Sequence, residues 1–155
     1  MPQNNRPGYK ALRAGRRSVT GHAYHITTCT HQRQSLFTDW WLARLTIHSM
    51  KDLHDDQWVG SLCFVIMPDH VHWLFTLSDG PPLSQVVKRF KGRSAQAINR
   101  YLARQGAVWE EGYHDHLSRA EEDWQAIARY IVANPLRAGL VENIGLYPHW
   151  DAIWL

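Results

Sequence analysis

The stretch from Trp58 to Leu77 constrains the fold more than any other part of this sequence. It holds two apolar runs, WVGSLCFVIM and HVHWLFTL, separated only by Pro68 and Asp69, which favour turns. In the first run both alternating sets are apolar: Val59, Cys63 and Val65 on one, and Leu62, Phe64 and Ile66 on the other. The sequence therefore predicts two strands joined by a tight turn, the first of them covered on both faces.

The other predicted elements complete an alternating order of strands and helices. They are a strand over 22–30, a helix from 38 to about 53, a helix over 83–105, an extended segment over 108–117 and a helix over 121–133. The last helix is expected to end before Pro135, because the residue preceding a proline disfavours the helical conformation. The order β-α-β-β-α-β-α predicts an α+β domain with an antiparallel sheet. We expect two helices on one face and the final helix on the other.

The charge of the chain is unevenly distributed. The formal net charge is only +3, but residues 1–17 and 81–105 carry basic side chains and no acid. Two basic segments on a near-neutral body indicate a polyanionic partner such as nucleic acid, since neutralising phosphates releases counterions. A solvated tail and a solvated helix face would give the same pattern. We expect a basic arm over 1–20, a domain over 21–140 and a loop-rich tail over 141–155.

Several classes of protein are not expected. No run of about 18 apolar residues is present, so a membrane span is not predicted. The first ten residues, MPQNNRPGYK, lack the apolar stretch of a secretory signal. Cys29 and Cys63 do not form a CxxC pair and are expected to be buried, reduced thiols. A cytoplasmic protein fits these features.

His70 and His72 are the first candidates for chemistry. Alternation along the second strand puts them on one face with Leu74, while Val71 and Trp73 lie on the other, core face. Two imidazoles about 7 Å apart on one face of a strand can converge on a divalent metal. A pair of half-buried, hydrogen-bonded histidines is the alternative, and the HxH spacing alone favours it.

Tyr130 lies near the end of the last predicted helix, and Asn134, one helical turn later, directly follows it. They border its apolar stripe, which consists of Trp124, Ile127, Ala128 and Ile131. If this helix covers the face that carries the histidines, two imidazoles, an amide oxygen and a phenol meet at one site. In the alternative, Tyr130 only borders the core and Asn134 only ends the helix.

A competing site lies in the segment Gly112–His116. It offers a second tyrosine, Tyr113, and a second HxH pair, His114 and His116. The spacing of these residues also fits a ligand pair on a strand, so the residues by themselves leave both sites open.

Several longer motifs of the sequence resemble those of a known family. The runs FVIMPDHVHWLFTL, VVKRF, VWEEGYHDH and RYIVANPLRAGLV resemble those of the REP-associated tyrosine transposases, which belong to the HUH single-tyrosine nuclease superfamily. The run LRAGRRSVTGHAYHITTCTHQRQSLFTD matches as well, so the resemblance covers nearly the whole chain. An HUH motif that follows an apolar strand and a PD turn, with YIxxNP downstream, is far more specific than HUH alone.

The resemblance implies a role for each candidate residue. The fold would be a ferredoxin-like βαββαβ core with the catalytic tyrosine on the following helix. His70 and His72 would be the HUH metal ligands, and Tyr130 rather than Tyr113 the nucleophile. Asn134, at the place of a glutamine in related insertion-sequence transposases, would complete the metal site.

The resemblance also implies a substrate and a cofactor. The family cleaves and rejoins single-stranded DNA near REP hairpins, short palindromes of bacterial genomes, through a 5′-phosphotyrosine and with Mg²⁺ or Mn²⁺. Because imidazole is not a typical ligand of Mg²⁺, we expect water and phosphate oxygens to complete the coordination. A monomer is favoured over a dimer, and the location implied is the bacterial cytoplasm, on the nucleoid when DNA is bound. The side chains expected to contact phosphates are Arg6, Lys10, Arg13, Arg16, Arg17, Lys88, Arg89, Lys91 and Arg93.

Two other functions stay open on the sequence alone. One is a domesticated protein that binds REP hairpins with little cleavage. The other is an RNA-binding module, because RNA-recognition folds share the same core order and stack bases on sheet aromatics.

Overall fold

A five-stranded antiparallel sheet forms the centre of the protein in the computed structural model, which describes residues 22–119 and 121–154. The strands lie in the order β5-β2-β4-β3-β6. The first four follow the order of a ferredoxin-like fold, as expected. Their bounds are β2 (Ala23–Cys29), β3 (Val59–Met67), β4 (His70–Leu77), β5 (His114–Ser118) and β6 (Trp150–Ala152).

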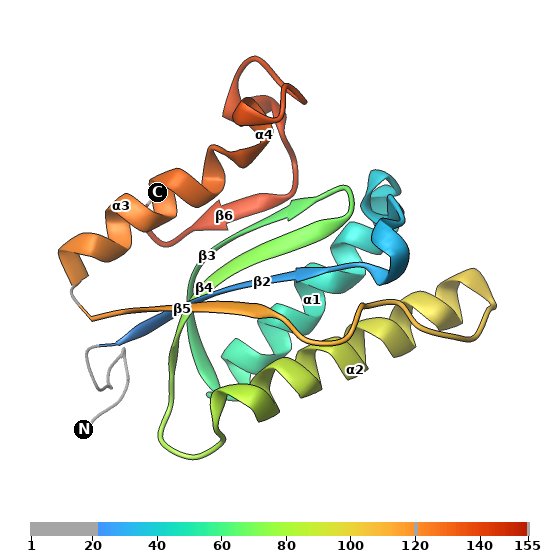
Figure 1. Ribbon diagram of the computed structural model, residues 1–155, viewed down its shortest axis with the longest axis horizontal. Coiled ribbons are helices and arrows are strands. Elements are labelled where there is room, and N and C mark those ends of the chain that lie inside the picture. Colours follow the sequence, from blue (N-terminus) through green and yellow to red (C-terminus); the bar gives the residue numbers. More distant parts are fainter. Residues whose placement is uncertain (1–21, 120, 155) are drawn as a thin grey trace.

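Helices cover both faces of this sheet (Figure 1). The long helices α1 (Trp40–Asp55) and α2 (Leu83–Leu102) lie side by side on one face, and α3 (Glu121–Val132) lies on the other. The remaining elements are short: η1 (His31–Arg33), η2 (Leu36–Thr38), α4 (Asn134–Arg137) and η3 (Ile144–Leu146). The predicted division into two helices on one face and one on the other is therefore confirmed. Within the residues described, no helix has the length and apolar character needed to cross a membrane.

The sheet separates two apolar cores. The larger core lies under α1 and α2 and includes Val71, Trp73 and Phe75 from β4. The smaller core lies under α3 and joins Leu74 of β4 to Ile131 of the helix. Strand β3 contributes to both cores, as its double apolar pattern predicts.

The faces of β3 differ from the simple alternation expected. The pairing with β4 shifts register between Ser61 and Cys63. This irregularity puts Leu62 and Cys63 together in the core under α3, and leaves Val59 in the core under α1 and α2. A bulge inserts one residue into the alternation, so that side chains before and after it exchange faces.

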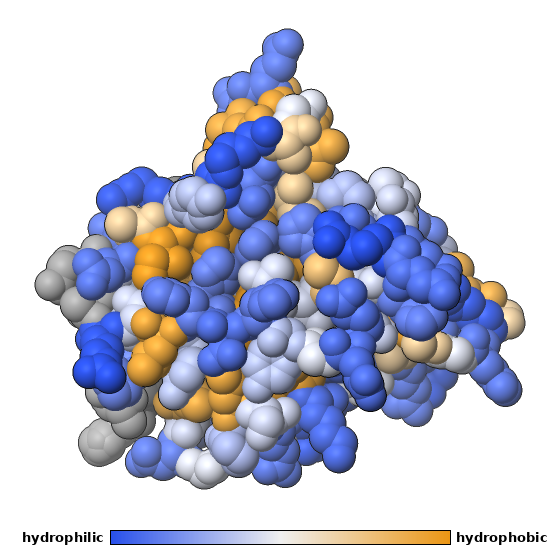
Figure 2. All heavy atoms as spheres, viewed as in Figure 1, coloured by the Kyte–Doolittle hydropathy of each residue, from blue (hydrophilic) through white to orange (hydrophobic). Residues whose placement is uncertain are grey.

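The end of the chain also departs from the prediction. The helix broken by Pro135 resumes as α4, because a proline is tolerated in the first turn of a helix. The segment expected as a loop-rich tail contains η3 and then β6, which pairs with β3 along the edge of the sheet. Figure 2 shows apolar side chains gathered at the tip formed by α4 and the turns after it, where Leu136, Leu140 and Leu146 are exposed.

Two smaller boundaries differ as well. Helix α2 ends at Leu102 rather than Gln105, because Ala103 adopts a left-handed conformation with φ of 54°. Strand β5 begins only at His114, and most of the extended segment before it is not part of the sheet.

A hydrogen-bonded pair anchors the segment before β5 to helix α2. The indole of Trp109 donates to the hydroxyl of Ser94 over 2.9 Å, and that hydroxyl donates to the carbonyl of Phe90 over 2.7 Å. Ser94 is completely buried. The hydroxyl therefore satisfies an indole N–H that would otherwise be buried without a partner.

We predict that Ser94→Ala lowers the free energy of unfolding by about 1–3 kcal/mol, the typical result of orphaning a buried donor. Ser84→Ala, at an exposed position of the same helix, serves as the matched control and should stay within about 0.5 kcal/mol of wild type. Urea unfolding followed by tryptophan fluorescence measures both. Equal stability of the two variants would contradict this assignment.

Candidate active site

His70 and His72 lie on the same face of strand β4, as the alternation predicts. Their neighbours Val71 and Trp73 enter the core under α1 and α2, whereas Leu74 enters the core under α3. The two imidazoles meet edge to face, with ring centroids 5.0 Å apart. The histidine pair therefore lies on the α3 side of the sheet, next to the turn between β3 and β4.

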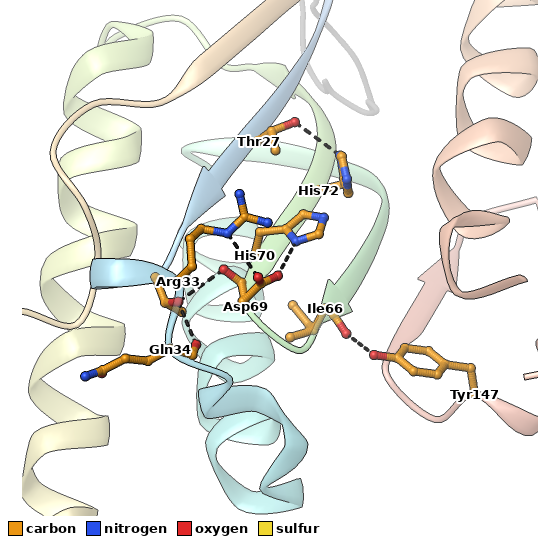
Figure 3. A network of polar contacts seen from close by, with 9 residues as sticks. Thr27, Arg33, Gln34, Ile66, Asp69, His70, His72 and Tyr147 are labelled. Atoms are coloured by element: carbon orange, nitrogen blue, oxygen red, sulfur yellow. Dashed lines mark hydrogen bonds and ion pairs between the residues drawn. The ribbon is translucent and has the colours of Figure 1, made fainter. Parts of the chain in front are cut away.

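The residue before the pair orients His70 (Figure 3). His70 Nδ1 lies 2.7 Å from Asp69 Oδ1, and Arg33 Nε donates to Asp69 Oδ2 over 3.0 Å. Burial alone would raise the pKa of Asp69, but the hydrogen bonds from His70 and Arg33 lower it overall. The carboxyl group is thus ionised near neutral pH and accepts from both partners, which leaves Nε2 of His70 for another ligand.

Strand β2 orients His72. Its Nδ1 lies 3.1 Å from the hydroxyl of Thr27 and 3.0 Å from Nε2 of His25. Thr27 is the direct partner of His72 in the antiparallel register, and His25 lies two residues before Thr27 on the same face. Cross-strand pairing therefore supplies the partners of this ring.

The half-buried imidazoles of His72 and His25 are held in their neutral form. Burial, followed by nearby positive charge that includes Arg137, lowers the pKa of His72 to about 3. Burial and the charge of His116 lower the pKa of His25 to about 4. A neutral imidazole keeps a nitrogen lone pair, which metal coordination requires.

The free nitrogens suit a metal ligand pair. A metal-binding histidine commonly donates its second N–H to a carboxylate or another acceptor, and that bond fixes the ring. His70 meets this condition through Asp69. His72 meets it when Nδ1 carries the proton and donates to Thr27 or His25. In both rings Nε2 is then the atom available to a cation.

The donor set is small. No cluster of three or more His, Cys, Asp and Glu side chains with metal-binding geometry occurs in the described part of the chain. A third protein ligand would have to be of another type. The Nδ2 atom of Asn134 donates to the carbonyl of Ile131 over 2.9 Å, which leaves the amide oxygen open.

Tyr130 is on the helix that covers the histidine face. Its neighbour Ile131 is completely buried in the core under α3, whereas 63% of Tyr130 is exposed. The guanidinium carbon of Arg137, from α4, lies 3.8 Å from the centre of the Tyr130 ring. Tyr130 belongs to α3, whereas Asn134, expected directly after the end of the last helix, is the first residue of α4.

The side chains of the competing segment, Gly112–His116, lie on both sides of the sheet. Tyr113 packs against the core under α1 and α2, and burial together with Asp115 raises its pKa. His114 and His116 pair with Thr27 and His25 in the register of β2 and β5, so they lie on the same face as His70 and His72. Tyr113 is thus separated by the sheet from both histidine pairs.

The basic residues of α2 lie in the helix layer across the sheet from the histidines. Arg89 stacks on the ring of Trp58 with 4.3 Å to the centroid, and Arg93 lies 3.5 Å from Asp56. Lys91 donates to the carbonyls of Glu110 and Gly112, and Lys88 is exposed. The other expected phosphate contacts, Arg6, Lys10, Arg13, Arg16 and Arg17, lie outside the described residues.

Four residues join the candidate site that the sequence did not single out. Asp69 and Arg33 orient His70, while Thr27 and His25 orient His72. The role of Asp69 could have been predicted from its position directly before the HxH pair. The roles of Arg33, Thr27 and His25 depend on which segments meet and in which register, and no local pattern of the sequence encodes that.

Comparison with known proteins supports the resemblance. Residues 18–134 match the family model described as "Transposase IS200 like". A curated relative from Escherichia coli K12, named REP-associated tyrosine transposase, is 23% identical over 134 residues, covering 84% of this chain and 76% of the relative. A putative REP-associated tyrosine transposase from Haemophilus influenzae is 25% identical over 99 residues, covering 57% of this chain and 56% of the relative.

Solved structures share the fold. A REP-associated tyrosine transposase bound to a REP hairpin has a TM-score of 0.70 and 21% identity, covering 85% of this chain and 77% of that one. A putative transposase from Deinococcus radiodurans has a TM-score of 0.55 and 22% identity, covering 74% and 92%. The resemblance expected from the sequence motifs is confirmed, and the chain belongs to the IS200-like transposase family.

Proposed function

We propose that this transposase is a metal-dependent single-stranded DNA endonuclease and strand transferase that acts at REP-type hairpins. The observation that carries the proposal is the histidine pair. Two imidazoles, each engaged by the protein at Nδ1, lie on the sheet face that is covered by the helix bearing Tyr130. Membership of the transposase family supports the same reading.

The donor set fits a divalent cation. The residues that would hold it are His70 and His72 through Nε2, with Asn134 through its amide oxygen. When bound, a divalent cation neutralises charge on the non-bridging oxygens of a phosphodiester. Three protein ligands leave positions for water and substrate, which suits Mn²⁺ or Mg²⁺ bound partly by the DNA.

Tyr130 is the proposed nucleophile. Its exposure lets a DNA strand reach the phenol, whereas Tyr113 lies on the other side of the sheet. Attack by the phenol oxygen forms a 5′-phosphotyrosine bond and releases a 3′-hydroxyl. The energy of the phosphodiester is retained in that bond, so another 3′-hydroxyl can reverse the step and rejoin DNA.

Two findings support the proposed partner. The curated relatives are REP-associated by name, and one fold neighbour is bound to a REP hairpin. Single-stranded DNA next to such a hairpin is therefore the proposed substrate. The basic residues of the N-terminal arm and of α2 remain predicted phosphate contacts.

We predict that Tyr130→Phe abolishes formation of a covalent protein–DNA adduct. The assay incubates the protein with a single-stranded REP-type hairpin oligonucleotide and Mn²⁺, and detects the adduct by denaturing electrophoresis. Removal of the metal with EDTA should also abolish the adduct in wild type, while Tyr113→Phe should leave it intact. An adduct in the Tyr130→Phe variant would disprove the nucleophile.

The adduct assay, together with a measurement of oligonucleotide binding, separates the alternative functions. Tight hairpin binding without an adduct under any divalent metal would favour a hairpin-binding protein. Preferential binding of single-stranded RNA would favour an RNA-binding module.

We predict that Asp69→Asn weakens Mn²⁺ binding about 10–100-fold, the usual effect of losing a group that orients a metal-bound histidine. The neutral amide no longer supplies the charge that makes His70 a stronger ligand. Isothermal titration with MnCl₂ measures the affinity in the absence of DNA. Asp79→Asn, an exposed aspartate, is the matched control, and equal affinities of the two variants would contradict the role of Asp69.

A further inference from the structure

Arg137 contacts a residue of the preceding helix, α3 (Glu121–Val132), and not only its own helix. It is the last residue of the short helix α4, and its guanidinium lies over the ring of Tyr130 at 3.8 Å from the centroid. The break between α3 and α4 makes this contact possible. Pro135 is buried in the first turn of α4, and the backbone N–H of Arg137 donates to the carbonyl of Ala133 over 3.0 Å.

The charge of Arg137 has no counterion among the residues that the structure describes. Within the described residues Arg137 forms no ion pair with a carboxylate. An exposed guanidinium thus lies against the proposed nucleophile, and no described acidic side chain neutralises it.

A purely structural role is the alternative. A cation over an exposed aromatic ring contributes about 0.5–1 kcal/mol and would help to hold α4 against α3. That role needs only the contact with the ring. It gives no reason for the contact to fall on the proposed nucleophile.

The geometry points to Arg137 as a catalytic residue that binds the non-bridging oxygens of the phosphate attacked by Tyr130. This inference rests on the function proposed above. A guanidinium presents donors in a planar fork that matches two phosphate oxygens. In the free protein the guanidinium of Arg137 lies on the ring of Tyr130. A change of its side-chain rotamer would bring it to a phosphate beside the phenol.

The charge balance of the reaction explains why a cation is needed there. The phenol oxygen of Tyr130 bonds to phosphorus, and the bond from phosphorus to the 3′ oxygen breaks. The phenol proton passes to water, and the leaving 3′ oxygen takes a proton from water. The diester carries one negative charge before and after the step, but a phenolate attacking it adds a second. Positive groups placed where this charge develops stabilise the transition state more than the ground state.

The test compares Arg137→Ala with wild type on two oligonucleotides. One carries an ordinary phosphodiester at the cleaved linkage, and the other a methylphosphonate, in which a methyl group replaces one non-bridging oxygen. With the phosphodiester, Arg137→Ala should slow adduct formation about 10²–10³-fold. With each methylphosphonate diastereomer, the ratio of wild-type to variant rate should fall toward one, because the charge that Arg137 binds is absent.

Two further variants complete the design. Arg137→Lys keeps the charge and loses the fork, so its rate should lie between those of wild type and Arg137→Ala. Arg129→Ala removes an exposed arginine next to Tyr130 on α3 and should react like wild type. Thermal unfolding of every variant shows whether the fold is intact.

A binding measurement without metal or chemistry gives an independent result. In a Tyr130→Phe background, we expect tighter binding of the phosphodiester than of the methylphosphonate oligonucleotide. Adding Arg137→Ala should remove most of that preference, and a preference that survives would overturn the assignment.

The experiments distinguish a failure of the proposed function from a failure of the proposed role of Arg137. Absence of an adduct in wild type would overturn the proposed function. A wild-type reaction in which Arg137→Ala lowers the rate equally on both linkages would leave that function standing and show that Arg137 is only structural.

Discussion

Strand β4 divides its side chains between two environments, and the positions of the candidate catalytic groups depend on that division. Val71, Trp73 and Phe75 are completely buried on one face. A shift of register by one residue would bring these side chains to the histidine face and put His70 and His72 into the core. Removing a buried aromatic side chain alone costs about 3–5 kcal/mol, so the register is strongly determined. The apolar residues of β4 thus hold the histidines in place.

The strands next to β4 then set the orientation of each imidazole. The turn before His70 is tied to the end of β2, because Thr30 donates to the carbonyl of Asp69 from its backbone N–H over 2.9 Å and from its hydroxyl over 3.2 Å. The carboxylate of Asp69 is held in turn by Arg33. On the other ring, Thr27 and His25 contact Nδ1 from the body of β2. Folding of the sheet therefore also leaves both Nε2 atoms free of these contacts, as the proposed metal site requires.

Local patterns in the sequence predicted much of this arrangement. The bounds of β4 and the start of α2 follow directly from alternation and from the Pro-rich turn before the helix. The face that carries His70 and His72 follows from the alternation alone, and the longer motifs pointed to Tyr130 rather than Tyr113. That choice agrees with the exposure of Tyr130 and the packing of Tyr113 on the far side of the sheet.

Features that depend on distant contacts could not be predicted in this way. The bulge in β3 puts Val59 and Cys63 on opposite faces of the sheet, and only the pairing with β4 reveals it. Strand β6 forms because the edge of β3 offers unpaired backbone groups, although its own three residues carry no strand pattern. The contact of His25 with His72 needs the β2–β4 register, and the position of Arg137 over Tyr130 needs the break at Pro135.

We propose that His70 and His72 present their Nε2 atoms to a divalent cation beside Tyr130. Anomalous diffraction at the manganese edge tests this most directly, in crystals of the Tyr130→Phe variant with Mn²⁺ and a single-stranded REP-type hairpin oligonucleotide. We expect a manganese peak bound by both Nε2 atoms and by a phosphate oxygen, with Asp69 still hydrogen-bonded to Nδ1 of His70. A peak located instead at His114 and His116, or coordination through Nδ1 with Asp69 displaced, would contradict it.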